Sequence, residues 1–439
     1  MHGEYRRHRR SNIWMPVDIS YASETLEAKT VDVSTSGMRL QRPGNLFLRP
    51  GEKLDITFRN KADTTVPATV AHVGKSHIGL QFYRRQLSEY ELRELYSVAP
   101  VWQRFFARAR RALWMHSRRF GVLAANTFLR RAIVGVVRPH FVFAVYGTEK
   151  EADTYFTPGM ARRMPPNLVL GFIRNQHMRG LLVASQTFEE ELQQDSGKVQ
   201  AYIDQLRADF PEVQRIALVG RLPNFVKKAG IEISAPLVEG SLGTRYMIWD
   251  VARQMKALPR YAQHKSIVVL GGAGRIGNAV CEDLTGEFET VIAFDPRYEE
   301  EEQLQVNEGT IIRTSNVARL QPEQLYIGLT HHGDVILDLS PHMPAGSLIA
   351  DDTHPCISLE AREQLQEQEI AVEKVVLSHE EFLMWPRMPA WNNRDIPGCL
   401  VEALVLLQHP KLEGQDFLSF CHEAKKMGFV GRLIRPLDE

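Results

Sequence analysis

Apolar and polar positions follow two different patterns along the chain, with a change near residue 100. Over residues 4–82 short apolar runs are separated by prolines and glycines, which is typical of strands joined by turns and predicts a small β-barrel or sandwich. Residues 87–138 place apolar side chains at helical spacing. From residue 141 onward strand-like runs alternate with helical stretches, a succession that predicts βαβ units around a parallel sheet.

A glycine-rich turn follows the apolar run 267–270 and precedes a helical stretch. The turn has the pattern G-x-G-x-x-G, formed by Gly272, Ala273, Gly274, Arg275, Ile276 and Gly277. We expect Gly272 to permit a tight turn, Gly274 to admit a pyrophosphate, and Gly277 to let helix and strand pack closely. A helix N-terminus at this point favours an anion, so the turn predicts a dinucleotide site. A turn that binds nothing is the alternative.

An acidic residue, Asp295, closes the next apolar run. A carboxylate there accepts a hydrogen bond from a ribose 2′-hydroxyl and repels a 2′-phosphate, so we expect NAD(H). Arg297 stands two residues later and keeps NADP(H) open as an alternative. The unit continues through apolar runs at 335–340, 347–353 and 372–378, which completes a doubly wound Rossmann domain.

Three short motifs occur in order within residues 4–100. They are an R-x-x-x-R element (Arg6, Arg10), a D-x-S-x-x-G element (Asp32, Ser34, Gly37) and a G-x-x-F strand (Gly79, Phe82). Together they resemble the PilZ family, which implies a six-stranded barrel that binds cyclic di-GMP. The resemblance implies that Arg6, Arg7 and Arg10 hold the phosphates and stack on guanine. It also implies that Asp32 and Ser34 make hydrogen bonds to the ligand and that Gly37 lets the backbone approach it closely.

A basic chain terminus has two other interpretations. It can be a solvated basic tail, or an arm that binds nucleic acid. No aromatic stacking pattern accompanies these arginines, so we expect no nucleic-acid partner.

Residues 101–138 contain nine arginines and no acid, interleaved with aromatic side chains. We favour an inter-domain helix that buries its aromatic stripe and leaves its arginines in solvent. The alternative is a basic amphipathic helix that binds an anionic membrane surface or an acidic protein.

Five short stretches of the body, taken with the glycine turn, resemble one group of enzymes. They are 238–244, 340–344, 349–352, 398–403 and 428–429. The resemblance is to cyanobacterial-type long-chain acyl-[acyl-carrier-protein] reductases and their shikimate-dehydrogenase-like relatives. It implies a small-molecule or acyl-carrier substrate, whose acyl group is carried on a cysteine and reduced by a nicotinamide cofactor. Cys399 matches that cysteine, whereas Glu239-Gly240-Ser241 departs from the T-G-N of the family.

Cys399 follows a Pro-Gly break and precedes the helical run 400–407. A cysteine at a helix N-terminus has a lowered pKa, so we expect a reactive thiolate there. The alternative is a small buried residue in the core. Cys281 and Cys421 are expected in the core, and Cys356 is a second candidate nucleophile.

Composition bounds the setting of the protein. The 439 residues carry no net charge, and the four cysteines are widely spaced, which favours a reduced cytoplasmic compartment. Neither a signal peptide nor a membrane span is expected, but the basic connector allows a position at the inner membrane. No metal site is indicated by the cysteine and histidine spacing. An oligomeric state is compatible with the sequence.

We therefore expect a multi-domain protein with an N-terminal six-stranded barrel and an α/β body. The expected segments are a PilZ-like domain (1–100), a basic helical connector (101–140), a small α/β substrate domain (141–258), a Rossmann domain (259–405) and a C-terminal helical segment that packs on the body (406–439). The leading hypothesis is a cyclic-di-GMP-responsive NAD(P)-dependent oxidoreductase that reduces an acyl thioester through Cys399. One rival is a non-catalytic signalling effector whose body binds a dinucleotide or a protein. Another is a dehydrogenase of hydroxy or amino acids.

Overall fold

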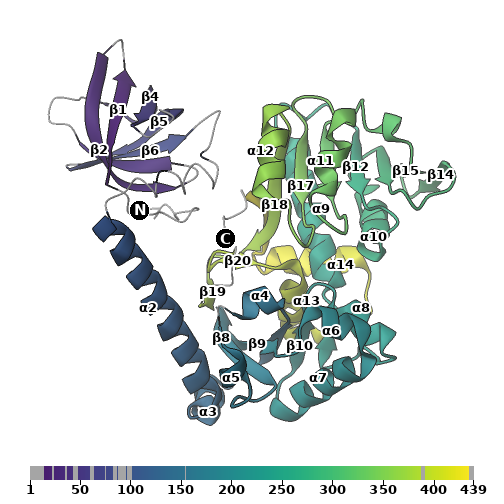
Figure 1. Ribbon diagram of the computed structural model, residues 1–439. Helices are drawn as coiled ribbons and strands as arrows, with labels where there is room; N and C mark the ends of the chain where they lie inside the picture. Colours follow the sequence, from purple (N-terminus) through teal and green to yellow (C-terminus); the bar gives the residue numbers. More distant parts are fainter. Residues whose placement is uncertain are drawn as a thin grey trace. The chain divides into compact units, whose positions relative to one another are not determined.

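The computed structural model describes most of the chain. The described residues are 14–21, 24–34, 37–42, 48–59, 64–74, 76–82, 87, 95, 101–153, 155–386 and 391–434. The chain forms two compact units, and the boundary between them along the chain lies between Ser117 and Arg118. The first unit contains a barrel, and the second contains two sheets (Figure 1).

The barrel is closed by six antiparallel strands in the order β1-β2-β3-β6-β5-β4. These are β1 (Pro16–Tyr21), β2 (Glu24–Ser34), β3 (Gly37–Gln41), β4 (Lys53–Phe58), β5 (Thr65–Val73) and β6 (His77–Phe82). Alternate residues face inward, as in β4, where Leu54, Ile56 and Phe58 are buried. The predicted six-stranded barrel is confirmed.

Helices α2 (Val101–Asn126) and α3 (Arg130–Val137) form the connector. Its preferred interpretation, with aromatic side chains buried and arginines in solvent, holds only in part for the side chains that the structure describes, since Arg131 and Arg138 are exposed. Phe120 is 70% exposed, whereas the Arg118 guanidinium stacks on Tyr155. Within the second unit, the end of α2 packs through Val122 and Asn126, which are buried.

The smaller sheet of the second unit has the order β11-β10-β7-β9-β8-β19. Its strands are β7 (Phe141–Val145), β8 (Asn167–Asn175), β9 (Met178–Ser185), β10 (Arg215–Leu218), β11 (Leu237–Val238) and β19 (Phe382–Trp385). Its helices are α4 (Glu149–Ala152), α5 (Pro158–Ala161), α6 (Glu189–Gln194), α7 (Ser196–Asp209) and α8 (Leu222–Lys228). Strand β19 comes from the segment expected to belong wholly to the Rossmann domain. It pairs with β8, so the chain returns to the smaller sheet.

The larger sheet has nine strands, of which β15-β13-β12-β16-β17-β18 are parallel neighbours in that order. The strands are β12 (Ser266–Leu270), β13 (Thr290–Phe294), β14 (Glu302–Val306), β15 (Gly309–Thr314), β16 (Leu325–Gly328), β17 (Leu348–Asp351), β18 (Ala371–Ser378), β20 (Asp395–Ile396) and β21 (Val430–Ile434). From β12 the chain first adds strands on one side of the sheet (β13, β15) and then on the other (β16, β17, β18). This is the strand order of a doubly wound Rossmann fold, as predicted.

Helices cover both faces of the larger sheet because its strands are apolar on both sides. In β12, Ile267 and Val269 belong to the core that contains α9 and α10, whereas Val268 and Leu270 belong to the core that contains α11 and α12. The helices are α9 (Ser241–Ala257), α10 (Arg275–Leu284), α11 (Val335–Leu339), α12 (Leu359–Glu367), α13 (Gly398–Gln408) and α14 (Phe417–Lys426), with short 3-10 turns η1 (Val317–Arg319), η2 (Ser340–His342) and η3 (Pro410–Leu412). The apolar run 335–340 is thus helical, and β16 is the strand that precedes it.

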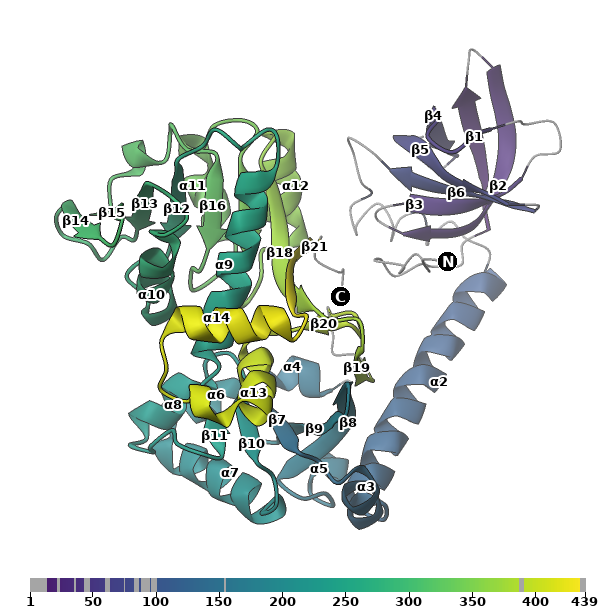
Figure 2. The ribbon, with the colours of Figure 1, turned by 180° about the vertical axis from the view of Figure 1, so that it is seen from behind.

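The C-terminal segment lies between the two sheets. Figures 1 and 2 both show α13 and α14 at the junction, and Tyr246 of α9 packs against Phe420 of α14. The segment ends in β21, which pairs with β18 of the larger sheet. It therefore joins the two lobes of the second unit.

Among the described residues, no single helix is long and apolar enough to cross a membrane. The pair Met115–Asn126 and Arg130–Val137 reaches that length and composition only together, with a bend of 78° between its halves.

Candidate functional site

The glycine turn lies at the carboxyl end of β12, beside β13. Gly271 has φ +88°, and a Cβ there would lie 2.4 Å from the carbonyl oxygen of Leu329. The turn glycine is therefore Gly271. The expectation that Gly272 takes this role is wrong. Gly272 instead packs against Ala293, to which an added Cβ would come within 2.8 Å.

The other two glycines of the motif lie at the start of α10. A Cβ on Gly277 would lie 2.2 Å from the Gly271 carbonyl oxygen, so only glycine lets α10 pack this closely on β12. Gly274 is the N-cap of α10, and an added Cβ there would meet only the Gly271 oxygen at 3.1 Å and the Arg297 guanidinium at 3.9 Å. The N-terminus of α10 is thus open on the side where a phosphate would bind.

Asp295 stands directly after β13 and is buried. Its carboxylate accepts hydrogen bonds from the Ala273 backbone (3.2 Å) and from the Arg297 backbone (3.0 Å) and guanidinium (2.9 and 2.8 Å). Burial raises the pKa of Asp295, but these hydrogen bonds outweigh burial and hold the pKa below its usual value. The carboxylate is ionised and fixed in place, with a cation beside it.

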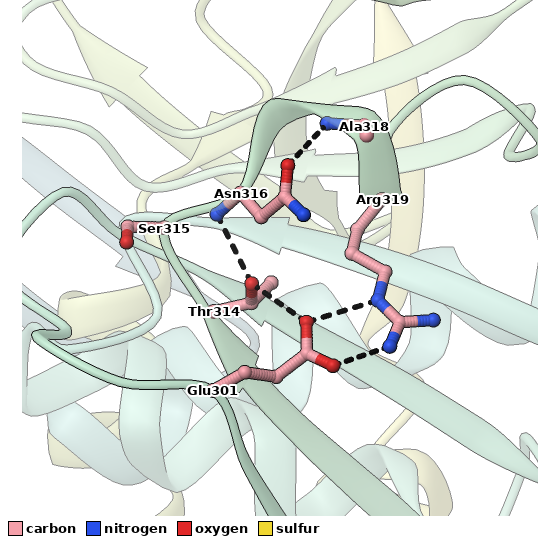
Figure 3. A pocket seen from close by; sticks show the side chains of 6 residues that line it. All are labelled: Glu301, Thr314, Ser315, Asn316, Ala318 and Arg319. Atoms are coloured by element: carbon pink, nitrogen blue, oxygen red, sulfur yellow. Dashed lines mark hydrogen bonds and ion pairs between the residues drawn. The ribbon is translucent and has the colours of Figure 1, made fainter.

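A hollow of about 560 Å³ opens at the carboxyl end of β15 (Figure 3). It is lined by Glu301, Thr314, Ser315, Asn316, Ala318 and Arg319. Hydrogen bonds hold its wall, with Thr314 donating to Glu301 (3.0 Å) and Ala318 donating to the Asn316 side chain (3.0 Å). The Asp295 backbone N–H donates to the Thr314 carbonyl (3.1 Å), so the hollow adjoins Asp295. Sequence reasoning missed it, because the strand order that brings β15 beside β13 is a tertiary feature.

Cys399 is the second residue of α13. It contacts the loop at Gly240, which follows β11 of the smaller sheet and precedes α9. A Cβ on Gly240 would lie 2.4 Å from the Cys399 Cβ, so this glycine leaves room for the cysteine. Burial raises the pKa of the thiol to about 12, although a backbone hydrogen bond from Gly220 lowers it. The expected lowered pKa is wrong, since the helix N-terminus does not offset desolvation. The thiol is neutral at pH 7.

The acid of the C-x-x-E pattern has a structural contact. Glu402 is buried, and its carboxylate accepts hydrogen bonds from the backbone N–H groups of Leu242 (2.6 Å) and Gly243 (3.3 Å) at the start of α9. Burial raises its pKa to about 7. Glu402 therefore fixes α13, with Cys399, against the Gly240 loop.

Further titratable groups gather at the carboxyl end of β17 and inside the neighbouring strand β18, where Lys374 lies opposite Asp351. Burial raises the pKa of Asp351 to about 6 and that of Asp352 to about 7, and the charge of Asp352 acts on Cys399. Burial also lowers the pKa of Lys374, whose ammonium lies 3.7 Å from the centre of the Trp391 ring. In the sequence the two aspartates stand out only as part of the 349–352 stretch. Lys374 could not be recognised, because a lysine inside a strand gives no sequence signal of a site.

Glu239 links the smaller lobe to the glycine turn. Its carboxylate pairs with Arg275, the first residue of α10, and with the Lys227 ammonium (2.6 Å). This acid stands where the resembling family has threonine, and here it occupies two cations beside the turn.

The D-x-S-x-x-G residues of the barrel form the β2–β3 hairpin. Asp32 is buried and pairs with Arg39 (2.6 Å), which lies opposite it because the register shifts between Thr30 and Asp32. Ser34 donates to the Gly37 carbonyl (2.9 Å). A Cβ on Gly37 would lie 2.4 Å from the Leu80 carbonyl oxygen, so packing on β6 requires a glycine at this position.

A family model agrees with this geometry. The model of the PilZ domain matches residues 4–96 of the chain. Residues 4–96 are a PilZ domain. The match covers the hairpin motif and the arginines Arg6, Arg7 and Arg10, which lie outside the described residues.

Solved structures with likeness to parts of the chain include PilZ proteins and a dehydrogenase. The inhibitor of motility (MotI/DgrA) of Bacillus subtilis is 17% identical over 22% of this chain and 49% of its own, with a TM-score of 0.18. The PilZ domain with c-di-GMP of YcgR from Escherichia coli is 18% identical over 25% of this chain and 95% of that domain, with a TM-score of 0.16. L-tryptophan dehydrogenase from Nostoc punctiforme is 10% identical over 66% of this chain and 80% of its own, with a TM-score of 0.31.

The chain thus spans about half the length of the motility inhibitor. No curated protein matches the chain. At these identities and TM-scores the likenesses indicate no function. In the part of the chain that the structure describes, no three His, Cys, Asp or Glu side chains gather to hold a metal.

Proposed function

We propose that the chain is a cyclic-di-GMP-binding sensor fused to an NAD(P)-dependent oxidoreductase body. One observation carries the proposal for the body. The glycine turn, Asp295 and the hollow at Thr314 follow one another at the carboxyl ends of β12, β13 and β15, which are adjacent strands. This succession suits the pyrophosphate, ribose and adenine of a dinucleotide, which also follow one another.

The type of dinucleotide is part of the proposal. The ionised Asp295 carboxylate suits a ribose with a free 2′-hydroxyl, which favours NAD(H). Arg297 hydrogen-bonds this carboxylate and is itself 65% exposed, so it offers a 2′-phosphate a cation. NADP(H) is therefore the second candidate.

The PilZ domain supports cyclic di-GMP as the regulatory ligand. Arg6, Arg7 and Arg10 are proposed to hold the phosphates and stack on guanine, since guanidinium groups do both. Asp32 and Ser34 lie at the hairpin end of β2, where they are proposed to bind the guanine edge together with the backbone at Gly37. Isothermal titration of an Arg6→Ala/Arg10→Ala variant tests this assignment, and retained affinity for cyclic di-GMP would contradict it.

The finer proposal is reduction of an acyl thioester from a small molecule or an acyl carrier. The Cys399 sulfur would attack the thioester carbonyl and expel the carrier thiol, and the acyl group would leave as an aldehyde after it accepts a hydride. A nicotinamide cofactor, held by the glycine turn and Asp295, would supply that hydride. Because the Cys399 thiol is neutral, its proton needs an acceptor, and Asp352 is the carboxylate whose charge acts on it.

The raised pKa of the Cys399 thiol favours a second candidate function. A thiol with a pKa of about 12 is a poor nucleophile, as expected if the body binds a dinucleotide or a protein partner without turnover. In that case cyclic di-GMP would control binding alone.

Two measurements on the full chain separate these functions. Titration with NAD(H), NADP(H) and cyclic di-GMP, singly and together, tests whether each ligand shifts the affinity of the other by the same factor. NAD(P)H oxidation with acyl thioesters is then followed for wild type, Cys399→Ser and Cys356→Ser. Turnover lost only in Cys399→Ser supports the reductase, whereas dinucleotide binding without turnover in wild type supports the effector.

A further inference from the structure

The corner between α2 and α3 presents apolar side chains to solvent. Phe120 is 70% exposed, Phe128 is 87% exposed, Leu129 is 51% exposed and Val136 is 79% exposed. Phe120 lies in the last two turns of α2, Phe128 and Leu129 lie in the connection, and Val136 lies in α3. Four large apolar side chains within 17 positions form an exposed surface, which monomeric proteins keep small unless it binds something.

The opposite side of α2 fixes the direction in which this surface faces. Val122 packs with Tyr155 and Phe156, and the Arg119 guanidinium donates to the Asp153 carbonyl (3.0 Å). The Asn126 side chain is also buried in this contact. With this side held by the lobe, Phe120 and Phe128 point away from it.

A second contact holds α3 and the corner. The Arg130 guanidinium pairs with Asp209 of α7 at 2.7 Å, and a hydrogen bond also joins it to the Asn167 carbonyl. Arg130 is thereby used within the lobe, whereas its neighbour Arg131, and Arg138 at the end of α3, are exposed. The corner therefore combines apolar side chains with exposed guanidinium groups.

The charge of the segment selects the kind of partner. Residues 101–138 hold nine arginines and no aspartate or glutamate. A second copy of this chain, seated on the same surface by two-fold symmetry, would bring like charges together. An anionic partner is attracted instead, because arginines near an anionic membrane surface each favour binding.

The shape of the corner selects between an anionic protein and a lipid surface. The two helices bend by 78°, the apolar side chains at the bend are exposed, and neither described hollow lies there. An exposed apolar corner with arginines beside it suits a deformable interface, into which aromatic side chains insert while guanidinium groups meet the head groups.

We propose that the α2–α3 corner, defined by Phe120, Phe128, Leu129, Val136, Arg131 and Arg138, is a peripheral binding surface for anionic phospholipid. This proposal is independent of the dinucleotide and of the catalytic role of Cys399. It places the connector between the PilZ domain and the body at the membrane surface.

Co-sedimentation of the full chain with lipid vesicles tests the proposal. We expect binding to phosphatidylglycerol vesicles that weakens with salt, and little binding to pure phosphatidylcholine. Phe120→Ser/Phe128→Ser and Arg131→Glu/Arg138→Glu should each reduce the partition coefficient about tenfold or more. All four substituted side chains are exposed, so the variants should fold, and circular dichroism checks this.

Matched controls and contrary outcomes make the test decisive. Leu418→Ser, at a 66% exposed position of α14, and Lys411→Glu, at an exposed position of η3, should leave vesicle binding unchanged. Equal binding to both kinds of vesicle, or unchanged binding of the two corner variants, would overturn the proposal. So would a wild-type dimer that the Phe120→Ser/Phe128→Ser variant converts to a monomer, since the surface would then be a contact between copies.

Discussion

The Glu402 carboxylate accepts a hydrogen bond of 2.6 Å from the backbone N–H of Leu242, 160 positions earlier in the chain. Leu242 is in the first turn of α9, where backbone N–H groups lack helical partners. The contact joins α13, which carries Cys399, to α9 and the Gly240 loop. Glu402 therefore helps to fix the position of the cysteine relative to the smaller lobe, together with the apolar packing of α13.

We expect Glu402→Gln to weaken the dependence of stability on pH. The pKa of Glu402 is raised from 4.5 to about 7, so between these values the folded state keeps a proton that the unfolded state has lost. This stabilisation is complete below the lower value and is lost as pH rises through the higher one, at about 1.4 kcal/mol per pKa unit. Glutamine cannot lose a proton, so the variant should lose less stability over this window.

Urea unfolding at about pH 5 and about pH 8 measures the difference. Asp351 and Asp352, whose pKa values are also raised, leave part of the pH dependence in the variant. Identical pH profiles for wild type and Glu402→Gln would show that Glu402 does not titrate in this range. Glu413→Gln, a change at a half-exposed acid of the same lobe, is the control.

Asn126→Ala should destabilise the second unit. The Asn126 side chain donates to the Val169 carbonyl (2.9 Å) and accepts from the Val169 N–H (2.7 Å), and all of these groups are buried. Alanine would leave both backbone groups without partners, at a cost of about 1–3 kcal/mol each. Urea unfolding measures the loss, and faster hydrogen exchange at the Val169 amide locates it. Gln200→Ala, which removes an exposed hydrogen bond to Asp204, should change little.

Glu239→Gln should tighten dinucleotide binding. The Glu239 carboxylate occupies Arg275 at the N-terminus of α10, and a pyrophosphate would compete for the same guanidinium. Removal of the negative charge frees Arg275, and a half-exposed ion pair of this kind corresponds to about a two- to fivefold gain in affinity. Titration calorimetry with NAD(H) measures it. Glu289→Gln, in the exposed pair with Lys265, should show no gain, and a loss in Glu239→Gln would mean that the acid binds the ligand itself.

Asp295→Ala and Arg297→Ala should shift cofactor preference in opposite directions. Without Asp295, NAD(H) loses a charged hydrogen-bond acceptor worth about 1.5–3 kcal/mol, while Arg297 is left to meet a 2′-phosphate. Without Arg297, NADP(H) loses its cation, and the pKa of Asp295 rises because the two guanidinium hydrogen bonds that help to lower it are gone. Dissociation constants for NAD(H) and NADP(H) with both variants give the ratio, and parallel losses for the two cofactors would contradict the assignment.

Local features of this chain could be predicted from its sequence. The alternation of buried and exposed positions predicts the strands of the barrel, and a glycine pattern between a strand and a helix predicts the turn at β12. These depend on backbone geometry within a few residues. Even there the turn glycine is Gly271, which has φ +88° and no room for a side chain beside Leu329, the residue after β16.

Features that depend on neighbours distant in sequence could not be predicted. The half-buried Cys399 has a raised thiol pKa because desolvation beside the Gly240 loop outweighs the helix N-terminus that the sequence shows. The exposure of Phe120 depends on which face of α2 the second unit covers. The sequence by itself thus determined the strands, the glycine turn and the identity of the PilZ domain, because these are written in local spacing. Burial and pairing, which set the charge state of Cys399, the partners of Glu239 and the surface of the connector, were decided only by the tertiary structure, because desolvation and ion pairing act through space.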